Sequence, residues 1–350
     1  DSSPQNTLSL QNGEKYTGDF VEGQRHGKGQ YTYLNGGVYE GDWTRDKISG
    51  KGKSVYPNKN VYVGEFLDGE IHGFGTLTYS DGDKYVGEWV HCRMHGKGTY
   101  CYKNGDKYEG MWLNDKRNGH GVVTYVSEDG ITAGERYEGN WLDGKMSGKG
   151  KYTYADGTTY EGDWENSQMQ GKGVYIFANG NRYEGEFQND MKHGSGELLY
   201  VNGERYVGEW EQDVANGKGR LEYASGDVFE GHFRDGKKDG QGTLNYKNGD
   251  RYEGMWKADR ACGEGTLFYH NGNAYKGNWV DDKRHGYGIL EVYADKSRYE
   301  GQWARNQRHG EGRIIDSSGN VLHAIFHEGT LQKVISFRFS DDSPWNSPYF

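Results

Sequence analysis

A short pattern of aromatic residues and glycine recurs along almost the whole chain at a nearly constant interval. Each copy reads Tyr/Phe-x-Gly-x-Trp/Phe, and we call its first aromatic residue the anchor. Successive anchors lie 23 residues apart, except for 29 residues before Tyr137 and 24 residues before Tyr299. Such a fixed period is typical of repeat architectures, in which each unit buries its apolar side with the help of the next. The thirteen anchors are Tyr16, Tyr39, Tyr62, Tyr85, Tyr108, Tyr137, Tyr160, Tyr183, Tyr206, Phe229, Tyr252, Tyr275 and Tyr299.

A second motif, Gly-x-Gly, begins eleven residues after every anchor, from Gly27 and Gly29 in the first unit to Gly310 and Gly312 in the last. Both exceptions in length therefore lie after this motif and before the next anchor. One connection in each unit varies in length and the other does not, which is expected when the constant connection is a fixed turn.

The repeats divide the chain into four predicted segments. A degenerate copy of the pattern, with Leu322, Ala324 and Phe326 at the anchor positions, follows the last complete unit. The segments are residues 1–15 as a partial repeat or cap, residues 16–312 as thirteen repeats with insertions near 126–134 and 289–298, residues 313–329 as a degenerate fourteenth repeat, and residues 330–350 as a C-terminal tail.

Each unit reads as two β-strands. Tyr39, Gly41 and Trp43 alternate with charged residues, which is the period of a half-buried strand, and the Gly-x-Gly segment alternates in the same way. Asn-Gly or Asp-Gly turns separate the runs on one side, and a polar connection of six or seven residues separates them on the other. We therefore predict an all-β fold, an elongated single-layer antiparallel sheet solenoid of 23-residue β-hairpin repeats that forms a twisted rod or groove.

An approximate register explains why the largest and smallest side chains share a strand. It pairs Phe20 with Gly27 and Gly18 with Gly29, and it brings Trp43 near Gly29 on the next interface. Every large ring then lies over a glycine, and we expect the rings to stack on their neighbours with much of the aromatic face left open. Aromatic pairs contribute about 0.5–1.5 kcal/mol beyond their burial, which could replace the missing aliphatic core.

The same register predicts cross-strand charge pairs on the opposite face. Pairs of this kind contribute about 0.2–1 kcal/mol each. The predicted pairs are Asp19 with Lys28, Asp42 with Lys51, Glu88 with Lys97, Asp163 with Lys172, and Glu209 with Lys218.

Composition narrows the classes of partner and compartment. The net charge of −10 disfavours nucleic acid as a partner. Three cysteines are too few for a disulfide framework, which favours an intracellular location, and no apolar run approaches the roughly 20 residues of a membrane helix. Gly-x-Gly is not a phosphate loop here, because no Gly-x-x-x-x-Gly-Lys-Ser/Thr occurs and no helix follows whose N-terminus could hold an anion. No catalytic arrangement of side chains stands out, so we expect neither enzymatic activity nor a cofactor.

The repeating unit resembles the MORN repeat, for instance in "YVGEWVHCRMHGKG" at residues 85–98. The resemblance covers residues 8 to about 329 and is specific because it recurs thirteen times. It looks like the repeat-only class of the family, which implies a non-enzymatic scaffold in the cytoplasm, docking cytoskeletal or axonemal proteins. The implied setting is an axonemal complex such as a radial spoke of a cilium or flagellum, or a structure of the cell cortex or of division.

Two sets of residues suggest additional sites. The residue types of His91, Cys92 and His95 suit zinc, but their spacing matches no standard zinc pattern. Basic residues recur in the polar connection and could form a rim that binds phosphoinositides, the basis of an alternative function as a peripheral membrane-association protein; an ordinary solvated loop is the other interpretation. The rim residues are Arg25, Lys116, Arg117, Lys192, Lys237, Lys238, Lys283, Arg284 and Arg308.

The C-terminal tail departs from the repeat and is rich in aromatic residues. It has two open interpretations, a cap over the last strand or a segment that binds a partner. Self-association through a terminal strand edge would give an antiparallel homodimer, since closed two-fold contacts are the commonest. The aromatic candidates for partner binding or self-association are Phe337, Phe339, Trp345, Tyr349 and Phe350.

Overall fold

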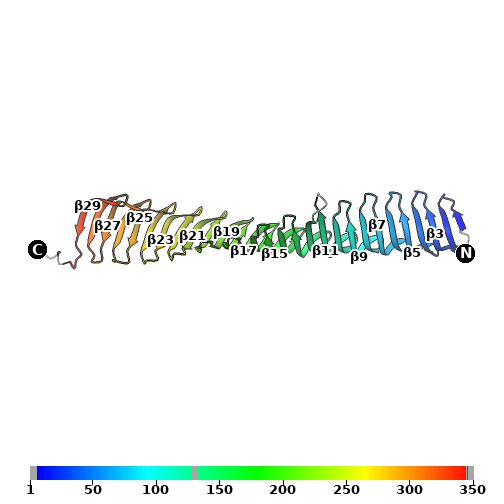
Figure 1. Cartoon of the computed structure of the whole chain (residues 1–350), viewed down its shortest axis with the longest axis horizontal. Helices are drawn as coiled ribbons and strands as arrows, with labels where there is room; N and C mark the ends of the chain where they lie inside the picture. Colours follow the sequence, from blue (N-terminus) through cyan, green and yellow to red (C-terminus); the bar gives the residue numbers. More distant parts are fainter. Residues whose placement is uncertain (1–5, 128–132, 344, 346–350) are drawn as a thin grey trace. The chain divides into compact units, whose positions relative to one another are not determined.

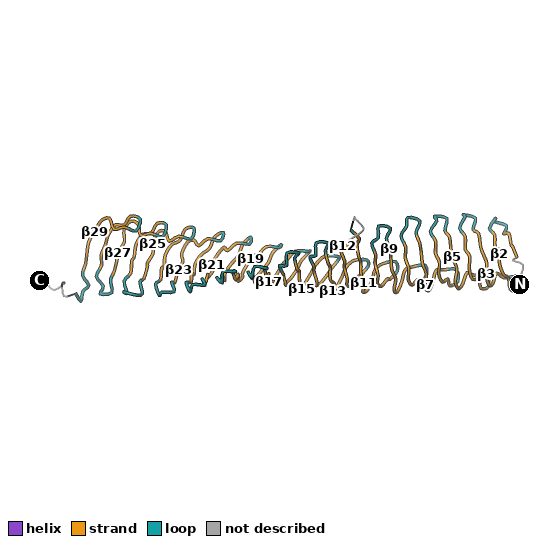
Figure 2. The backbone as a smooth tube through the Cα atoms, in the orientation of Figure 1, coloured by secondary structure: helices purple, strands orange, loops and turns teal. Residues whose placement is uncertain are grey.

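The computed structural model describes residues 6–127, 133–343 and 345. The chain divides into two compact units, Asp1–Ala178 and Asn179–Phe350, and every element assigned in the described residues is a β-strand. In each unit the strands follow one another in chain order, joined by short loops (Figures 1 and 2). The extensive contacts of each strand are with the strands before and after it. Each unit is therefore a single open layer of antiparallel hairpins, which confirms the predicted fold class.

The fifteen described strands of the first unit are β1 (Asn6–Ser9), β2 (Lys15–Val21), β3 (Gln24–Thr32), β4 (Val38–Thr44), β5 (Lys47–Val55), β6 (Val61–Leu67), β7 (Glu70–Thr78), β8 (Lys84–Val90), β9 (Arg93–Cys101), β10 (Lys107–Leu113), β11 (Lys116–Val126), β12 (Ala133–Leu142), β13 (Lys145–Thr153), β14 (Thr159–Glu165) and β15 (Gln168–Ile176).

The fourteen described strands of the second unit are β16 (Arg182–Gln188), β17 (Met191–Leu199), β18 (Arg205–Glu211), β19 (Val214–Glu222), β20 (Val228–Arg234), β21 (Lys237–Asn245), β22 (Arg251–Lys257), β23 (Arg260–Phe268), β24 (Ala274–Val280), β25 (Lys283–Glu291), β26 (Arg298–Ala304), β27 (Gln307–Ile315), β28 (Val321–His327) and β29 (Thr330–Arg338).

The polar connection predicted to span six or seven residues is a turn of two. Between β2 and β3 these residues are Glu22 and Gly23, with φ angles of 51° and 79°. Two consecutive left-handed residues suit the tight turns that match the twist of a hairpin. Each strand therefore extends into the polar connection that was predicted to be a loop. As a result, residues predicted to form the basic rim, such as Arg25 and Lys116, lie within strands.

The first strand of each hairpin carries the anchor ring over a pair of glycines. Gly18 on β2 pairs with Gly29 on β3, as predicted. A Cβ atom added to Gly29 would lie 2.3 Å from the hydroxyl oxygen of Tyr16, and one on Gly18 would lie 2.5 Å from the Cα of Gly29. The Tyr16 hydroxyl donates a hydrogen bond of 2.9 Å to the carbonyl oxygen of Asp19. The predicted nesting of rings over glycine is confirmed.

The predicted pairing of Phe20 with Gly27 is wrong, because a β-bulge intervenes. Phe20 pairs with Arg25, and the register shifts between Gly18 and Phe20. The first glycine of the motif has a φ of 66°, which lets β3 carry the extra residues of the bulge. On the next interface the backbone of Trp43 pairs with Gly27, and its side chain lies near Gly29 as predicted. Its indole nitrogen still reaches that position and donates 3.1 Å to the Gly29 carbonyl.

The anchor rings on the aromatic face are buried, which corrects the expectation of stacked rings left open. The ring of Tyr16 meets Phe20 of its own unit at 84° and Trp43 of the next unit at 80°, both edge to face. Edge-to-face packing lets the tryptophan of each unit cover the anchor of the unit before it. Twelve anchors are less than 2% exposed: Tyr16, Tyr39, Tyr62, Tyr85, Tyr108, Tyr137, Tyr160, Tyr183, Phe229, Tyr252, Tyr275 and Tyr299.

The predicted charge pairs also change because of the bulge. The Asp19 carboxylate accepts the backbone N–H of Lys28 at 3.0 Å, and Asp42 accepts that of Lys51 at 2.9 Å. The ammonium group of Lys28 instead pairs with Asp42 on the following strand. The carboxylates therefore satisfy backbone donors exposed by the bulge, and the lysines link one hairpin to the next.

Insertions leave the contacts of the sheet unchanged. In most units the tryptophan nitrogen bonds a glycine carbonyl fourteen residues earlier, as Trp43 does with Gly29. Trp141 makes the same bond across 20 residues and Trp303 across 15, at 3.2 and 3.1 Å. Extra chain between hairpins is thus absorbed outside the ring and glycine layer.

Candidate binding grooves

The face opposite the rings carries a groove in each unit. The groove of the first unit has a volume of about 970 Å³ and extends from Thr17 to Thr76; that of the second has about 1080 Å³ and extends from Val207 to Ile289. Their floors consist of glycines that lie beneath the anchor rings, Gly29, Gly41, Gly52, Gly64 and Gly75 in one groove and Gly219, Gly231, Gly242, Gly254, Gly265 and Gly277 in the other.

The walls are the residues that flank these glycines. Side chains alternate between the two faces of a strand. An anchor ring fills the ring side of each of these glycines, so the residues before and after the glycine point to the opposite face. Val207, Lys218 and Glu230 take such positions in the second unit and line its groove. The same glycines therefore leave room for the core on one side and a floor without side chains on the other.

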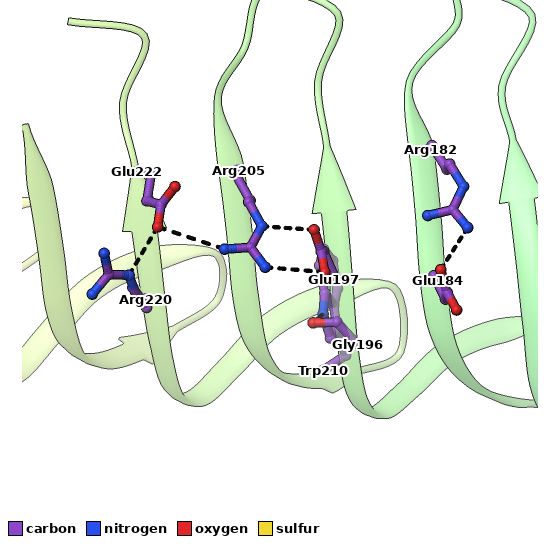
Figure 3. A network of polar contacts seen from close by, with 8 residues as sticks. All are labelled: Arg182, Glu184, Gly196, Glu197, Arg205, Trp210, Arg220 and Glu222. Atoms are coloured by element: carbon purple, nitrogen blue, oxygen red, sulfur yellow. Dashed lines mark hydrogen bonds and ion pairs between the residues drawn. The ribbon is translucent and has the colours of Figure 1, made fainter. Parts of the chain in front are cut away.

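Charges along the groove face of the second unit are largely paired with one another (Figure 3). Arg205 donates two bonds to Glu197, with nitrogen–oxygen distances of 2.6 and 3.2 Å, and lies 3.5 Å from Glu222. Arg220 lies 3.0 Å from Glu222 and also pairs with Glu230. The hydrogen bonds from Arg205 lower the pKa of Glu197, so this carboxylate is ionised at neutral pH.

One aromatic side chain stands on the wall of each groove. Phe74 in the first unit and Tyr287 in the second occupy the middle position of Gly-x-Gly, and they are 57% and 51% exposed. Lysine or another polar residue takes this position in most other units, for example Lys28. The alternation within a single repeat does not distinguish these two residues, whereas comparison of this position across the repeats does.

Six residues of the predicted basic rim lie on the aromatic face. Each occupies the second position of its strand, where other units have Ile48 or Met169 in the core. The guanidinium carbon of Arg25 lies 4.5 Å from the centre of the Trp43 ring, a cation–π contact. The corresponding distances are 4.8 Å for Arg117 on Trp141, 5.2 Å for Lys192 on Trp210, 4.4 Å for Lys238 on Trp256, 4.4 Å for Arg284 on Trp303 and 4.8 Å for Arg308 on Tyr299.

Lys238 shows how far these cations enter the ring layer. It is only 9% exposed, and desolvation by its surroundings lowers the pKa of its ammonium group. The three other rim residues, Lys116, Lys237 and Lys283, begin their strands and are exposed. The ammonium nitrogen of Lys116 lies 3.2 Å from Asp143. The predicted rim is therefore divided between two environments.

The metal candidates occupy one turn and the strand after it. His91 and Cys92 form the left-handed turn before β9, and the Nδ1 atom of His91 lies 2.7 Å from Glu70. His95 lies within β9, where its Nδ1 atom is buried without a hydrogen-bond partner. In the described part of the chain, no three His, Cys, Asp or Glu side chains are grouped so that they could hold a metal ion.

The tail forms the last strand. β29 pairs with β28, and the Phe337 ring on it is 53% exposed and 5.0 Å from the ring of Phe339. Trp345 is also exposed. Tyr349 and Phe350 lie outside the described residues. Lys333 and Ile335 stand where the other units have the two glycines.

Fold and grooves together define a solenoid of β-hairpin repeats, a class without enzymatic function of its own. Thirteen consecutive segments match the MORN repeat, and they cover most of the chain. The chain therefore belongs to the MORN-repeat family. The matched residues are 16–38, 39–61, 62–84, 85–107, 108–130, 137–159, 160–182, 183–205, 206–228, 229–251, 252–274, 275–291 and 299–321.

Comparison with solved structures gives distant similarities. One is to the SAS-4 (dCPAP) TCP domain of Drosophila melanogaster in complex with a proline-rich motif of Ana2 (dSTIL), with 16% identity over 51% of this chain and 90% of that chain and a TM-score of 0.30. Another is to the wild-type TCP10 domain of Danio rerio CPAP, with 13% identity over 66% of this chain and 94% of that chain and a TM-score of 0.24. These TM-scores are too low to carry an argument.

A search of curated protein sequences finds no match. Among the described residues, no helix has the length and apolar character needed to cross a membrane.

Proposed function

We propose that this protein is a non-enzymatic scaffold of a cytoskeletal assembly that docks protein partners in its two grooves. The observation that carries this proposal is the difference between the two faces of the sheet: the rings on one face are buried, and the grooves with glycine floors on the other face are open. The cytoskeletal setting, at an axoneme such as a radial spoke or at the cell cortex, rests on the resemblance to repeat-only members of the family.

The grooves are better docking surfaces than the aromatic face. A partner on the ring layer would meet side chains such as Trp43 and Tyr39 that already pack on one another and expose almost no area. A partner in a groove meets exposed wall residues that differ from unit to unit, such as Lys218 and Gln241. The glycine floor has no side chains that would block its approach. Variation along an otherwise regular array is what allows a scaffold to select a partner.

Self-association through β29 is the second part of the proposed function. Its outer edge pairs with no other described strand of its unit, and Leu331, Ile335 and Phe337 on it are exposed. Two copies of an edge strand paired antiparallel form a two-fold contact. Light scattering on the purified full chain should give the mass of a dimer, and Ile335→Pro, which removes a backbone donor, should give a monomer. A monomeric unmodified chain would remove this part of the proposal.

The alternative of lipid binding has weaker support, because six of the nine basic rim residues are engaged with rings on the aromatic face. Flotation with phosphoinositide-containing and neutral vesicles tests it. We expect neither vesicle to carry the protein at physiological salt. Binding to the phosphoinositide vesicles that is lost in the combined Lys116→Glu, Lys237→Glu and Lys283→Glu variant would favour the lipid function instead.

Detergent extraction of cells that express the tagged full chain tests the scaffold function. The unmodified protein should stay with the insoluble cytoskeleton, and the combined Phe74→Arg and Tyr287→Arg variant should become soluble with an unchanged melting temperature. Val201→Arg adds a charge at an exposed hairpin loop outside the grooves and serves as the control. Equal retention of all three proteins would show that the grooves do not dock the partner.

A further inference from the structure

The groove of the second unit repeats along its length with a period that the sheet sets. Each repeat contributes two strands, and neighbouring strands lie about 4.8 Å apart, so equivalent groove positions recur about every 9.6 Å. The eight strands from β18 to β25, which hold Val207 and Ile289, line this groove and give it four repeats. An occupant that makes the same contact with each repeat must have a matching period.

Of the regular chain conformations, polyproline II matches this period best. It has three residues per turn and rises about 3.1 Å per residue, so it repeats about every 9.3 Å. Seven residues of an α-helix rise about 10.5 Å, and the mismatch with the groove grows to about 3 Å over four repeats. A β-strand repeats every two residues, about 6.6–6.8 Å, so successive repeats of the groove would meet opposite sides of it.

The floor of the groove also excludes an added strand. Gly242 pairs with Gly231 on one side and with Gly254 on the other, so its strand lies inside the sheet with both edges used. A segment in the groove therefore gains no ladder of backbone hydrogen bonds. Polyproline II needs none, because its carbonyl groups can accept bonds from wall donors such as Gln241 and Asn278.

The charge of the lining favours an uncharged occupant. Three cations and three carboxylates line this groove, and the guanidinium of Arg220 pairs with Glu230 of the lining and with Glu222 beside it. A charged ligand would gain no net attraction and would compete with these pairs. The lining residues with charge are Lys218, Arg220, Lys276, Glu230, Glu253 and Glu264.

Tyr287 gives the groove its apolar contact. Its ring is 51% exposed at the end of the groove, and Ile289 lies two residues further along the same face of β25. Aromatic rings are the surfaces on which proline side chains pack in proteins that recognise polyproline II segments. A rigid segment of this kind also loses little conformational entropy on binding.

We propose that the groove of the second unit, from Val207 to Ile289, binds an uncharged proline-rich segment in the polyproline II conformation, with one triplet of residues for each repeat. This inference rests on the proposed function and specifies the chemistry of the docked partner. The groove of the first unit contains Lys28, Lys51 and Lys53 against Glu40 and Glu65, so it is not balanced in charge.

The test uses the purified full chain and fluorescein-labelled peptides in an anisotropy titration. The probe contains four Pro-Pro-Ala triplets, and the controls are an alanine-rich helical peptide and a Gly-Ser peptide of the same length. We expect saturable binding of the proline peptide alone. Tyr287→Thr should weaken it at least tenfold, and Phe74→Thr, the same change at the equivalent position of the first groove, should leave it unchanged.

Absence of saturable binding up to millimolar peptide, equal binding of the helical peptide, or equal loss in both variants would overturn the proposal. Melting temperatures of the two variants should match that of the unmodified chain, and binding of a two-triplet peptide should be weaker than that of the four-triplet peptide. If the peptide fails to bind while the Phe74→Arg and Tyr287→Arg variant still leaves the cytoskeleton, docking holds and this inference does not. If the peptide binds but retention is unaffected, the inference holds and the proposed function does not.

Discussion

The two faces of each sheet are made by the same glycines, yet one is closed and the other is open. Toward the rings, Gly29 provides the space that the Tyr16 side chain fills. Toward the groove, the same residue leaves a floor without side chains. A single layer of strands can therefore have both a buried ring layer and a long open groove, although only 33% of the residues of the chain are hydrophobic.

The faces also differ in how much they vary along the chain. The anchor is tyrosine in every complete unit except the one that begins with Phe229. The wall position between the two glycines differs between units, with Lys51, Phe74, Gln241 and Glu264 as examples. The uniform face buries the rings, and the variable face is the one on which we propose that partners dock, so substitutions should separate stability from docking.

Filling the space beneath an anchor should have the largest effect on stability. Gly29→Ala places a Cβ within 2.3 Å of the Tyr16 hydroxyl oxygen and 2.4 Å of its ring, and overpacking of this kind typically destabilises by about 1–3 kcal/mol. Thermal and urea unfolding followed by circular dichroism measure the change. Gln30→Ala, one residue further on the groove face, is the matched control and should change the midpoint little.

A second variant shows whether the clash is with the hydroxyl group. Tyr16→Phe combined with Gly29→Ala should recover little of the lost stability, because the ring carbons of Tyr16 lie 2.4 and 2.5 Å from the added Cβ, and a Cβ on Gly242 would lie 2.4 Å from the Phe229 ring, which has no hydroxyl group. If Gly29→Ala and Gln30→Ala unfold at the same midpoint, the ring and glycine explanation of the closed face is wrong.

Changing the bulge should have the next largest effect. Gly27 has a φ of 66°, where an L-residue is less stable by about 1–2 kcal/mol. Gly27→Ala should therefore lower the unfolding midpoint, and Gly27→Asn should lower it less because asparagine tolerates this conformation. Equal midpoints for the alanine and asparagine variants would contradict a backbone origin of the effect.

Replacing a cation in the ring layer should have a smaller effect. Arg284→Met keeps the packing that methionine gives at this position in other units and removes the cation–π contact, so we expect a loss of about 0.5–1 kcal/mol. Arg284→Ala should lose more, since it also removes the packing of the side-chain stem. Urea unfolding measures both, and an unchanged midpoint for Arg284→Ala would show that the side chain adds nothing to the closed face.

Acid should weaken the links between hairpins. Hydrogen bonds from the backbone N–H and the side chain of Arg25 lower the pKa of Asp46. Because the folded-state pKa lies below the unfolded one, the stabilisation is present at neutral pH and is lost as the pH falls through the lowered pKa of the folded state. Melting temperatures between pH 7 and pH 3 should fall, and Asp46→Asn should reduce the size of that fall. A steeper fall of the melting temperature in Asp46→Asn would contradict the stabilising role of the Asp46 carboxylate.

Substitutions on the groove wall should have the smallest effect on stability. Lys218→Gln and Glu264→Gln change exposed side chains, so each should alter the free energy of unfolding by less than about 0.5 kcal/mol. Their combined effect should appear in retention of the protein by the detergent-insoluble cytoskeleton. A large drop in melting temperature would mean that the open face also stabilises the sheet.

The repeat, the two strands of each unit and the glycines beneath the rings could all be predicted from the sequence, because period, alternation and side-chain size point to the same arrangement. The bulge could not. A shift of two residues keeps every side chain on its face, so the pairings of Phe20 with Gly27 and with Arg25 satisfy the same alternation. Only the left-handed backbone of Gly27 distinguishes them.

The candidate sites were harder to predict than the fold. Arg25 and Lys238 sit next to polar turn residues, so the sequence placed them in a solvated rim, whereas strands that begin closer to the turn carry them into the ring layer. The grooves could not be predicted from the sequence, because their floors consist of glycines and no side chain marks them. They become visible only when both faces of Gly242 and its neighbours are considered together.

The connections between hairpins can change length while the Trp141 and Trp303 nitrogens keep their bonds to glycine carbonyls. The two-residue turns keep a constant length within each hairpin, and the loops at the opposite end vary in length. New sequence can therefore be added at those loops, one hairpin at a time, without changing either the packed ring layer or the groove on the other face.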